Sequence, residues 1–154
     1  MIYSRPKGRA MALPPLRATL ITLGVRDVER AARFYAELGM KRGVKAAKDV
    51  AFFEAGGVVL AVWGRADLPK DAGLEDSKPG FSGVALAFNV SDEASVDTTL
   101  QAAEKAGGRI VKPGGRAFWG GYTGYFADPD RHLWEVAHNP GFPLDESGQI
   151  ELSG

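Results

Sequence analysis

The chain contains no cysteine, and that absence excludes several kinds of chemistry. Without thiols there is no disulfide, no cysteine nucleophile and no thiolate metal site. A cysteine-free chain also fits a reducing compartment, so we expect a cytoplasmic protein. Histidine is almost as scarce, because His132 and His138 are the only two. Few side chains are therefore left to hold a transition metal.

Excess charge and long apolar runs are also missing. Nineteen basic and nineteen acidic residues leave no net charge, so we expect neither nucleic acid nor an anionic membrane as partner. No run of about 18 apolar residues is present, which excludes a membrane-spanning helix. The basic start lacks the apolar segment of a signal peptide, and we expect residues 1–16 to be a mobile extension.

Within its 154 residues the chain repeats one layout. In the first half a β-rich stretch ending at Val25 precedes Asp27, which is suited to cap a helix over 28–38. In the second half a strand over 83–90 precedes Asp92, which caps a helix in the same way. A glycine follows each helix and is expected to end it. The repeat indicates a duplicated unit whose two copies pack against each other.

Three strands are expected after each helix, so the unit reads βαβββ. They are 40–45, 49–55 and 58–63 in the first half, and 109–112, 122–127 and 132–138 in the second. A loop is expected at 113–115, where a proline precedes two glycines. We therefore predict an α+β fold with two βαβββ modules, over 17–64 and 82–140. A linker over 65–81 joins them, and a tail over 141–154 follows.

The most informative stretch runs from Trp119 to Val136 and indicates two strands joined by an Asp-Pro-Asp turn. Glu135 stands in the middle of the otherwise apolar second strand, where a carboxylate is costly to bury without a partner. Three interpretations are open. In the first, Glu135 is a general base. In the second, it binds a cationic or hydroxyl-bearing ligand. In the third, it is held by a hydrogen bond or by a nearby basic residue such as Lys112 or Arg116.

Aromatic residues concentrate near this carboxylate, and aromatic walls suit flat or amphipathic ligands. Trp134 alternates away from Glu135 along its strand, so we assign it to packing. Trp119 and Tyr122 stand at a glycine-rich strand entrance and are the better pocket candidates. Asn89 shares a strand face with two alanines and is a further candidate. The predicted ligand-binding residues are thus Asn89, Trp119, Tyr122 and Glu135, with Tyr125 in the same aromatic stretch.

Three segments carry a resemblance to a known family. They are the stretch from Leu23 to Tyr35 with the following Leu-Gly, the strand from Leu86 to Val90, and the hairpin from Gly124 to Glu135. Together they resemble the vicinal oxygen chelate superfamily, which includes glyoxalase I, bleomycin-resistance proteins and extradiol dioxygenases. The resemblance implies two βαβββ modules whose sheets curl around a central cup. One departure is Arg131, which stands where the pattern usually has glycine.

The resemblance also implies where a metal would bind. Metal-dependent members carry ligands at four strand positions, which correspond here to Leu20, Ala61, Ala85 and Glu135. Three of the four are aliphatic. Both histidines alternate away from Glu135 and cannot join it on a regular strand. Since a divalent site normally needs three or four protein ligands, we expect no metal and no cofactor.

Two functional classes follow from these expectations. The first is a metal-free protein, resembling the bleomycin-resistance members, that binds a small organic molecule in an apolar, aromatic cup. The second is an enzyme of the same superfamily. It would be a metal-dependent lyase, isomerase or dioxygenase, or a metal-free enzyme with Glu135 as general base. We expect a homodimer in either case, because exposed sheet edges are usually covered.

Overall fold

The structure is a computed structural model that describes residues 15–44, 47–78 and 80–152. The expected N-terminal extension lies outside the described residues except for its last two. The first module consists of β1 (Leu20–Val25), α1 (Val28–Glu37), β2 (Lys41–Gly43), β3 (Val50–Glu54) and β4 (Val59–Gly64). A short helix, α2 (Asp67–Asp71), follows in the linker. The second module consists of β5 (Ala85–Asn89), α3 (Glu93–Lys105), β6 (Arg109–Arg116), β7 (Tyr122–Ala127) and β8 (Leu133–His138).

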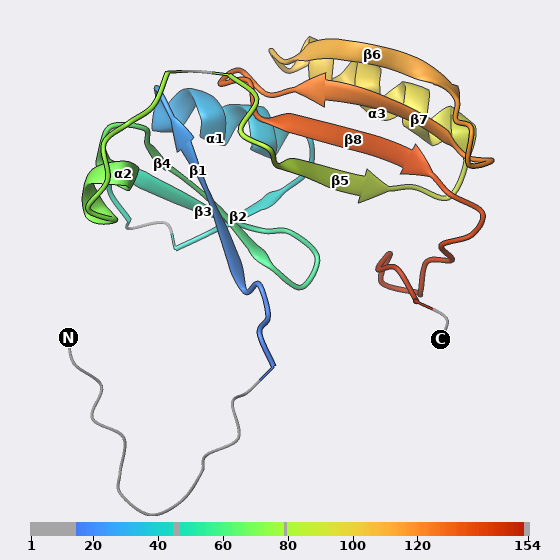
Figure 1. The fold of residues 1–154 in the computed structure, drawn as a ribbon, viewed down its shortest axis with the longest axis horizontal. Coiled ribbons are helices and arrows are strands. Elements are labelled where there is room, and N and C mark those ends of the chain that lie inside the picture. The colour runs from blue at the N-terminus through green and yellow to red at the C-terminus, as the bar shows by residue number, and fades with distance from the viewer. Residues whose placement is uncertain (1–14, 45–46, 79, 153–154) are drawn as a thin grey trace, which may run out of the picture.

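Each module forms one four-stranded mixed sheet with the same topology. The strand orders are β1-β4-β3-β2 and β5-β8-β7-β6, so the first strand of each module pairs with the last. That pairing is parallel, and the other pairings are antiparallel. The sheets lie side by side and are not closed into one barrel (Figure 1). The predicted α+β fold with two βαβββ modules is confirmed.

The helices begin at the predicted caps. Asp27 accepts a hydrogen bond from the amide of Arg30 at 3.1 Å, and Asp92 accepts one from the amide of Ser95 at 2.7 Å. Each carboxylate thus satisfies one of the free amides of a first helical turn. The helices end before Gly39 and Gly107, both of which adopt positive φ angles.

Two strand boundaries differ clearly from the prediction, since β2 is shorter than the expected 40–45 and β6 is longer than the expected 109–112. The expected loop at 113–115 lies inside β6, which continues to Arg116 with two register shifts against β7. Near this part of β6, strand β7 carries Gly124, which both β6 and α3 approach closely. A Cβ at Gly124 would lie 2.5 Å from the side chain of Leu100 and 2.9 Å from the carbonyl of Lys112. Glycine therefore lets β6 and α3 pack tightly against β7.

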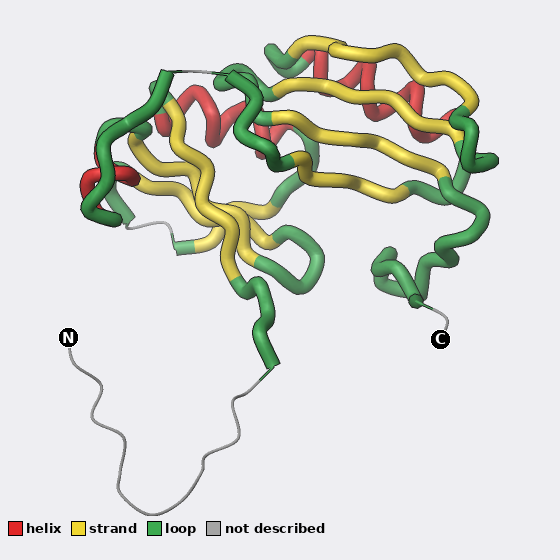
Figure 2. Tube along the Cα trace, viewed as in Figure 1, coloured by secondary structure: helices red, strands yellow, loops and turns green. Residues whose placement is uncertain are grey.

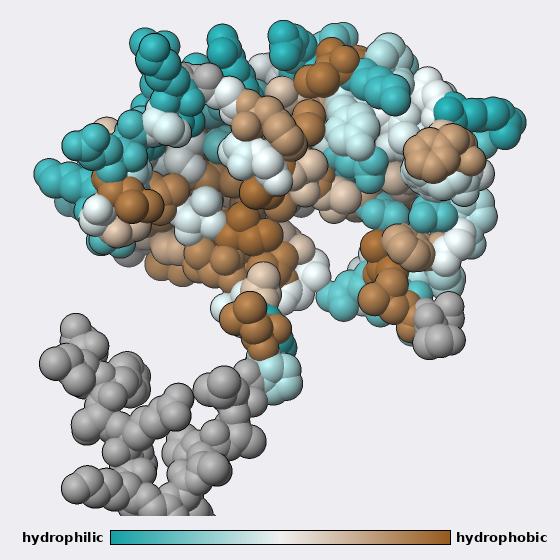
Figure 3. All heavy atoms as spheres, in the orientation of Figure 1, coloured by the Kyte–Doolittle hydropathy of each residue, from teal (hydrophilic) through white to brown (hydrophobic). Residues whose placement is uncertain are grey.

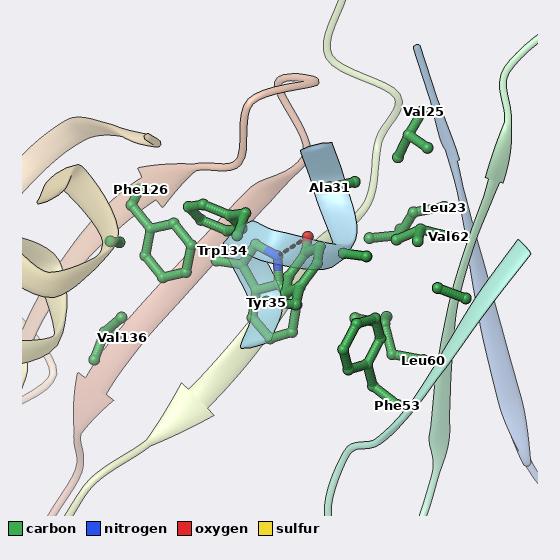
Figure 4. Packing of buried hydrophobic residues seen from close by; sticks show 14 of the residues in the cluster. Leu23, Val25, Ala31, Tyr35, Phe53, Leu60, Val62, Phe126, Trp134 and Val136 are labelled. Atoms are coloured by element: carbon green, nitrogen blue, oxygen red, sulfur yellow. Dashed lines mark hydrogen bonds between the residues drawn. The ribbon is translucent and has the colours of Figure 1, made fainter. Parts of the chain in front are cut away.

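A single hydrophobic core joins the two modules. Helix α1 packs Ala31 and Tyr35 onto the first sheet, against residues such as Phe53, and its other aromatic contacts reach the second sheet. The tilted rings of Tyr35 and Trp134 lie 6.0 Å apart, and the indole of Trp134 donates a hydrogen bond to the Tyr35 hydroxyl at 3.2 Å (Figure 4). Because α1 is shared in this way, the modules are held in one arrangement.

The two long helices, α1 and α3, each cover one face of a sheet, and the short α2 contacts the other face of the first sheet near Gly24. In Figure 2 the second sheet lies in front of α3, and no helix of the described residues lies on its opposite face. That free face of the second sheet is where the predicted carboxylate lies. Among the described residues, no helix has the length and apolar character needed to cross a membrane.

Candidate functional site

Strand alternation divides the side chains of the second sheet between its two faces. Trp134 and Val136 point to the helix side and belong to the hydrophobic core. Glu135, between them on β8, points to the opposite side, which we call the open face. Ala87 on β5 and Tyr125 on β7 are its direct neighbours across the strands. The open face therefore carries the carboxylate that the sequence singled out.

The partner of Glu135 is a tyrosine rather than a basic side chain. The Tyr125 hydroxyl donates a hydrogen bond to Oε2 of Glu135 at 2.7 Å, a short charge-assisted contact. This bond to the carboxylate, together with partial burial, raises the pKa of the Tyr125 phenol. No described side chain donates to the second oxygen of Glu135. The pair thus offers a bound ligand one free carboxylate oxygen and one phenol oxygen.

The first module has the same positions but not the same chemistry. Its sheet pairs Phe52 with Ala61 in the register that pairs Tyr125 with Glu135 in the second sheet. Both the phenol hydroxyl and the carboxylate are therefore absent from the first copy of the duplicated unit.

The other predicted site residues lie in different places. Asn89 shares the open face with Glu135 but is at the end of edge strand β5, beside Ala137. Trp119 lies in the connection between β6 and β7, where its ring packs over Gly121 and leaves 40% of the residue exposed. The structure does not bring Trp119 into contact with Glu135.

Tyr122 requires a correction. We expected it beside Glu135, but alternation along β7 turns it to the helix side of the sheet. Its hydroxyl donates to the carboxylate of Asp97 on α3 at 2.9 Å. That hydrogen bond raises the pKa of the Tyr122 phenol. Tyr122 therefore anchors α3 to the sheet, and Tyr125 takes the place that we had expected for it.

The sequence did contain a signal for Tyr125. The turn between β7 and β8 closes with a hydrogen bond from the Asp128 amide to the His132 carbonyl. Counting outward from that closing pair places Tyr125 opposite Glu135 and Tyr122 opposite His138. The hairpin register, rather than nearness to the glycines, identifies the tyrosine that contacts the carboxylate.

The same turn holds a buried carboxylate that the sequence analysis did not single out. Asp128 is 3% exposed and accepts a hydrogen bond from the Tyr35 hydroxyl at 2.6 Å. Its other oxygen accepts from the amides of Asp130 and His132, each at 2.9 Å. Burial raises the pKa of the Asp128 carboxyl. Because Tyr35 comes from α1, this contact ties the turn of the second module to the first.

The donor atoms around Glu135 do not fit a divalent metal. The family-derived positions Leu20, Ala61 and Ala85 offer no ligand atoms. The described ranges contain no group of three or more histidine, cysteine, aspartate or glutamate side chains placed to hold an ion. His132 is bonded to the carbonyl of Gly24 at 2.7 Å, and His138 to the carbonyl of Val90 at 3.3 Å. One carboxylate and one phenol fall short of the usual ligand number.

Comparisons with known proteins agree with the fold and the duplicated layout. The family model described as the glyoxalase/bleomycin resistance protein/dioxygenase superfamily matches residues 17–136. A crystal structure of a glyoxalase-related enzyme from Fulvimarina pelagi is 36% identical, with a TM-score of 0.81. The match covers 90% of this chain and 99% of that one. A search of curated proteins found no match.

More distant structures show the fold alone. A glyoxalase/bleomycin resistance protein/dioxygenase from Nocardioides is 24% identical, with a TM-score of 0.69 and coverage of 87% of this chain and 91% of that chain. A lactoylglutathione lyase from Agrobacterium tumefaciens is 23% identical, with a TM-score of 0.62 and coverage of 82% and 96%. The match of the family model over most of the chain, with the 36% identical structure, assigns the family. The chain belongs to the glyoxalase/bleomycin resistance protein/dioxygenase superfamily.

Proposed function

We propose that this protein binds a small organic molecule on the open face of its second sheet, through Glu135 and Tyr125. One observation carries the proposal: a hydrogen-bonded tyrosine–glutamate pair stands where the duplicated module has Phe52 and Ala61. A polar pair set in an otherwise aliphatic surface is the usual form of a site that orients a ligand.

The surroundings of the pair define the ligand in chemical terms. On the open face Ala87 presents an exposed methyl group next to the carboxylate, and Ala137 fills the surface beneath. A ligand there would place an ammonium or hydroxyl group on the free oxygen of Glu135 and an apolar group on Ala87. Tyr125 would remain the internal partner that holds the carboxylate in position.

We further propose that this binding needs no metal, because the donor atoms near Glu135 are too few. Elemental analysis of the purified protein is expected to find no stoichiometric transition metal. About one zinc, iron, nickel or manganese ion per chain would overturn this part of the proposal.

We also propose that the protein is a cytoplasmic homodimer in which a second copy lies over the open face and encloses the ligand bound there. No helix of the described residues lies on that face, and edge strand β6 leaves Val111 46% exposed. Such an apolar edge is usually covered in an assembly. Light scattering coupled to size exclusion is expected to give twice the mass of one chain, and a monomer mass at micromolar concentration would contradict the dimer.

The binding proposal is tested by thermal-shift screening of the full chain against a panel of amines, hydroxy acids and aromatic metabolites. A cognate ligand should raise Tm in the native protein. The Glu135→Gln and Tyr125→Phe variants should reduce or abolish that rise. Glu104→Gln, an exposed substitution on α3, is the matched control and should leave it unchanged. Equal shifts in all four proteins would place the ligand elsewhere.

An enzymatic role is the second candidate, and it is favoured by the 36% identical relative, which is described as an enzyme. In that case Glu135 would use its free oxygen to take a proton from a bound substrate, with Tyr125 holding the carboxylate. Turnover of any hit from the screen distinguishes the two roles. If product formation disappears in Glu135→Gln while binding persists, the result would support the role of Glu135 as general base. Binding without product would support the first proposal.

A further inference from the structure

A large groove lies between the two modules and borders the open face, with which it shares Ala87 and Asn89. It has a volume of about 1130 Å³, and Glu135 is not among the residues that line it. Its walls are edge strand β5, the first half of α3, the end of α1, the β3–β4 turn and the C-terminal tail. Figure 3 shows the opening between the first module and the tail. The volume exceeds the roughly 300–1,000 Å³ usual for small-molecule sites, so the groove has room for a large ligand.

The charged residues that line this groove are of one sign, while Lys41, the cross-strand neighbour of Glu54, lies outside the lining. Its lining residues include four acids and no lysine, arginine or histidine. The acids are Glu37, Glu54, Asp145 and Glu146, which come from three separate segments of the chain. None of them forms an ion pair within the described ranges. Hydrogen bonds from Ser147 lower the pKa of the Asp145 carboxyl, so that group stays negative at neutral pH.

The same walls present aromatic and aliphatic surface. Phe88 projects from β5 with 49% of the residue exposed, and the edges of Phe126 and Trp134 lie deeper. Leu38 and Met40 add aliphatic surface from the first module. An aromatic ring and acidic side chains in the lining of one groove both attract an organic cation, the ring through its π face and the acids through their negative potential.

The C-terminal tail closes one side of the groove in a defined conformation. Leu144 and Ile150 form an antiparallel bridge, and the turn between them is held by hydrogen bonds to Asp145. Gln149 then reaches the first module, where its amide donates to the carbonyl of Gly56 at 2.8 Å. A Cβ on Gly57 would lie 2.6 Å from that amide, so the glycine leaves room for the contact.

From the volume, the one-signed charge and the exposed aromatic side chain, we infer that this groove is a binding site for an amphipathic organic cation. The apolar body of the ligand lies along Phe88 and Met40, and its cationic centre lies toward Glu37 and Glu54. The tail, fastened by Gln149, covers the bound molecule. This site does not depend on the role proposed for Glu135.

Ethidium, a flat aromatic cation, serves as the probe, and its binding to the full chain is followed by fluorescence anisotropy at low ionic strength. We expect saturable binding to one site per chain. The Glu37→Gln/Glu54→Gln double variant should raise Kd about tenfold, and Phe88→Ala should raise it about threefold. Glu75→Gln/Glu104→Gln removes the same charge from exposed positions outside the groove and should change Kd less than about twofold. Gln149→Ala should speed dissociation.

The outcomes separate this site from the open face. Glu135→Gln should leave ethidium binding unchanged, and the anionic dye 8-anilinonaphthalene-1-sulfonate should not compete with ethidium. The inference is overturned if ethidium does not saturate, or if both double variants weaken binding equally. It is also overturned if Glu135→Gln weakens binding as much as the groove variant does, a result that would leave the function proposed above intact.

Discussion

The two modules share a topology and a strand register, yet they differ at the centre of the face that no helix covers. The first sheet places Phe52 opposite Ala61, and the second places Tyr125 opposite Glu135. Solvent access differs as well, since Ala61 is 1% exposed and Glu135 is half-buried. Duplication therefore supplied two equivalent backbones, and the polar pair is carried only by the copy with the more accessible position.

A second difference lies in the turns before the last strands. In the first module the residues with positive φ in this turn are Gly56 and Gly57. In the second module Arg131 adopts φ +68°, a conformation that disfavours any side chain with a Cβ. The second turn instead has the buried Asp128, whose carboxylate accepts hydrogen bonds from two backbone amides of the turn and from the Tyr35 hydroxyl of the first module. Side-chain hydrogen bonds thus hold a turn that glycine permits in the other module.

The largest effect is expected from Asp128→Ala. The substitution removes the acceptor of the Tyr35 hydroxyl and of two turn amides, and should lower the free energy of unfolding by about 3 kcal/mol. Tyr35→Phe removes only one of these bonds, together with the acceptor of the Trp134 indole, and should cost about 1–2 kcal/mol. Urea unfolding monitored by fluorescence measures both. Equal losses would mean that the turn amides find other partners.

Ala61→Glu tests whether the first module can carry the carboxylate of the second. Because Ala61 is fully buried, a glutamate there has neither water nor a phenol partner, and we expect a loss of about 2–3 kcal/mol. Ala85→Glu, at an exposed position, is the matched control and should cost less than about 0.5 kcal/mol. A stable Ala61→Glu protein would show that the two sites are equally accessible.

The pH dependence of stability should reveal the buried acid of the second turn. Burial raises the folded-state pKa of Asp128 above its ordinary value of about 3.9, so the folded chain binds the proton more tightly than the unfolded chain. The stability from this group is greatest below about pH 3.9 and is lost as pH rises through the folded pKa. The difference in unfolding free energy between native and Asp128→Asn proteins should therefore fall from pH 4 to pH 7. A constant difference would mean that Asp128 has an ordinary pKa.

The smallest effect is expected from Arg131→Gly, which gives the second turn the residue type of the first. Relief of the positive φ should outweigh the greater freedom of glycine in the unfolded chain and stabilise the protein by about 0.5–1 kcal/mol. Calorimetry should show a rise in Tm of about 2–3 °C. Arg131→Lys keeps both the charge and the Cβ, and should give no rise. A gain in the lysine variant would assign the effect to the side chain instead.

Local patterns were sufficient to predict most elements. Asp27 and Asp92 cap their helices, because capping involves only residues three positions apart. The prediction of a loop at 113–115 was wrong, because an edge strand can include proline and glycines when its register shifts against the neighbouring strand. Trp134 was correctly assigned to packing from strand alternation alone.

What the sequence alone determined is the duplicated βαβββ plan and the isolated position of Glu135, because caps, alternation and turns act over a few residues. Tertiary structure decided which tyrosine meets that carboxylate, and it turned Tyr122 to Asp97 on the other side of the sheet. It also brought Asp128 to Tyr35, and Gln149 to Gly56, from distant parts of the chain. Such contacts depend on how whole helices and strands pack together, and a pattern of a few neighbouring residues does not determine that packing.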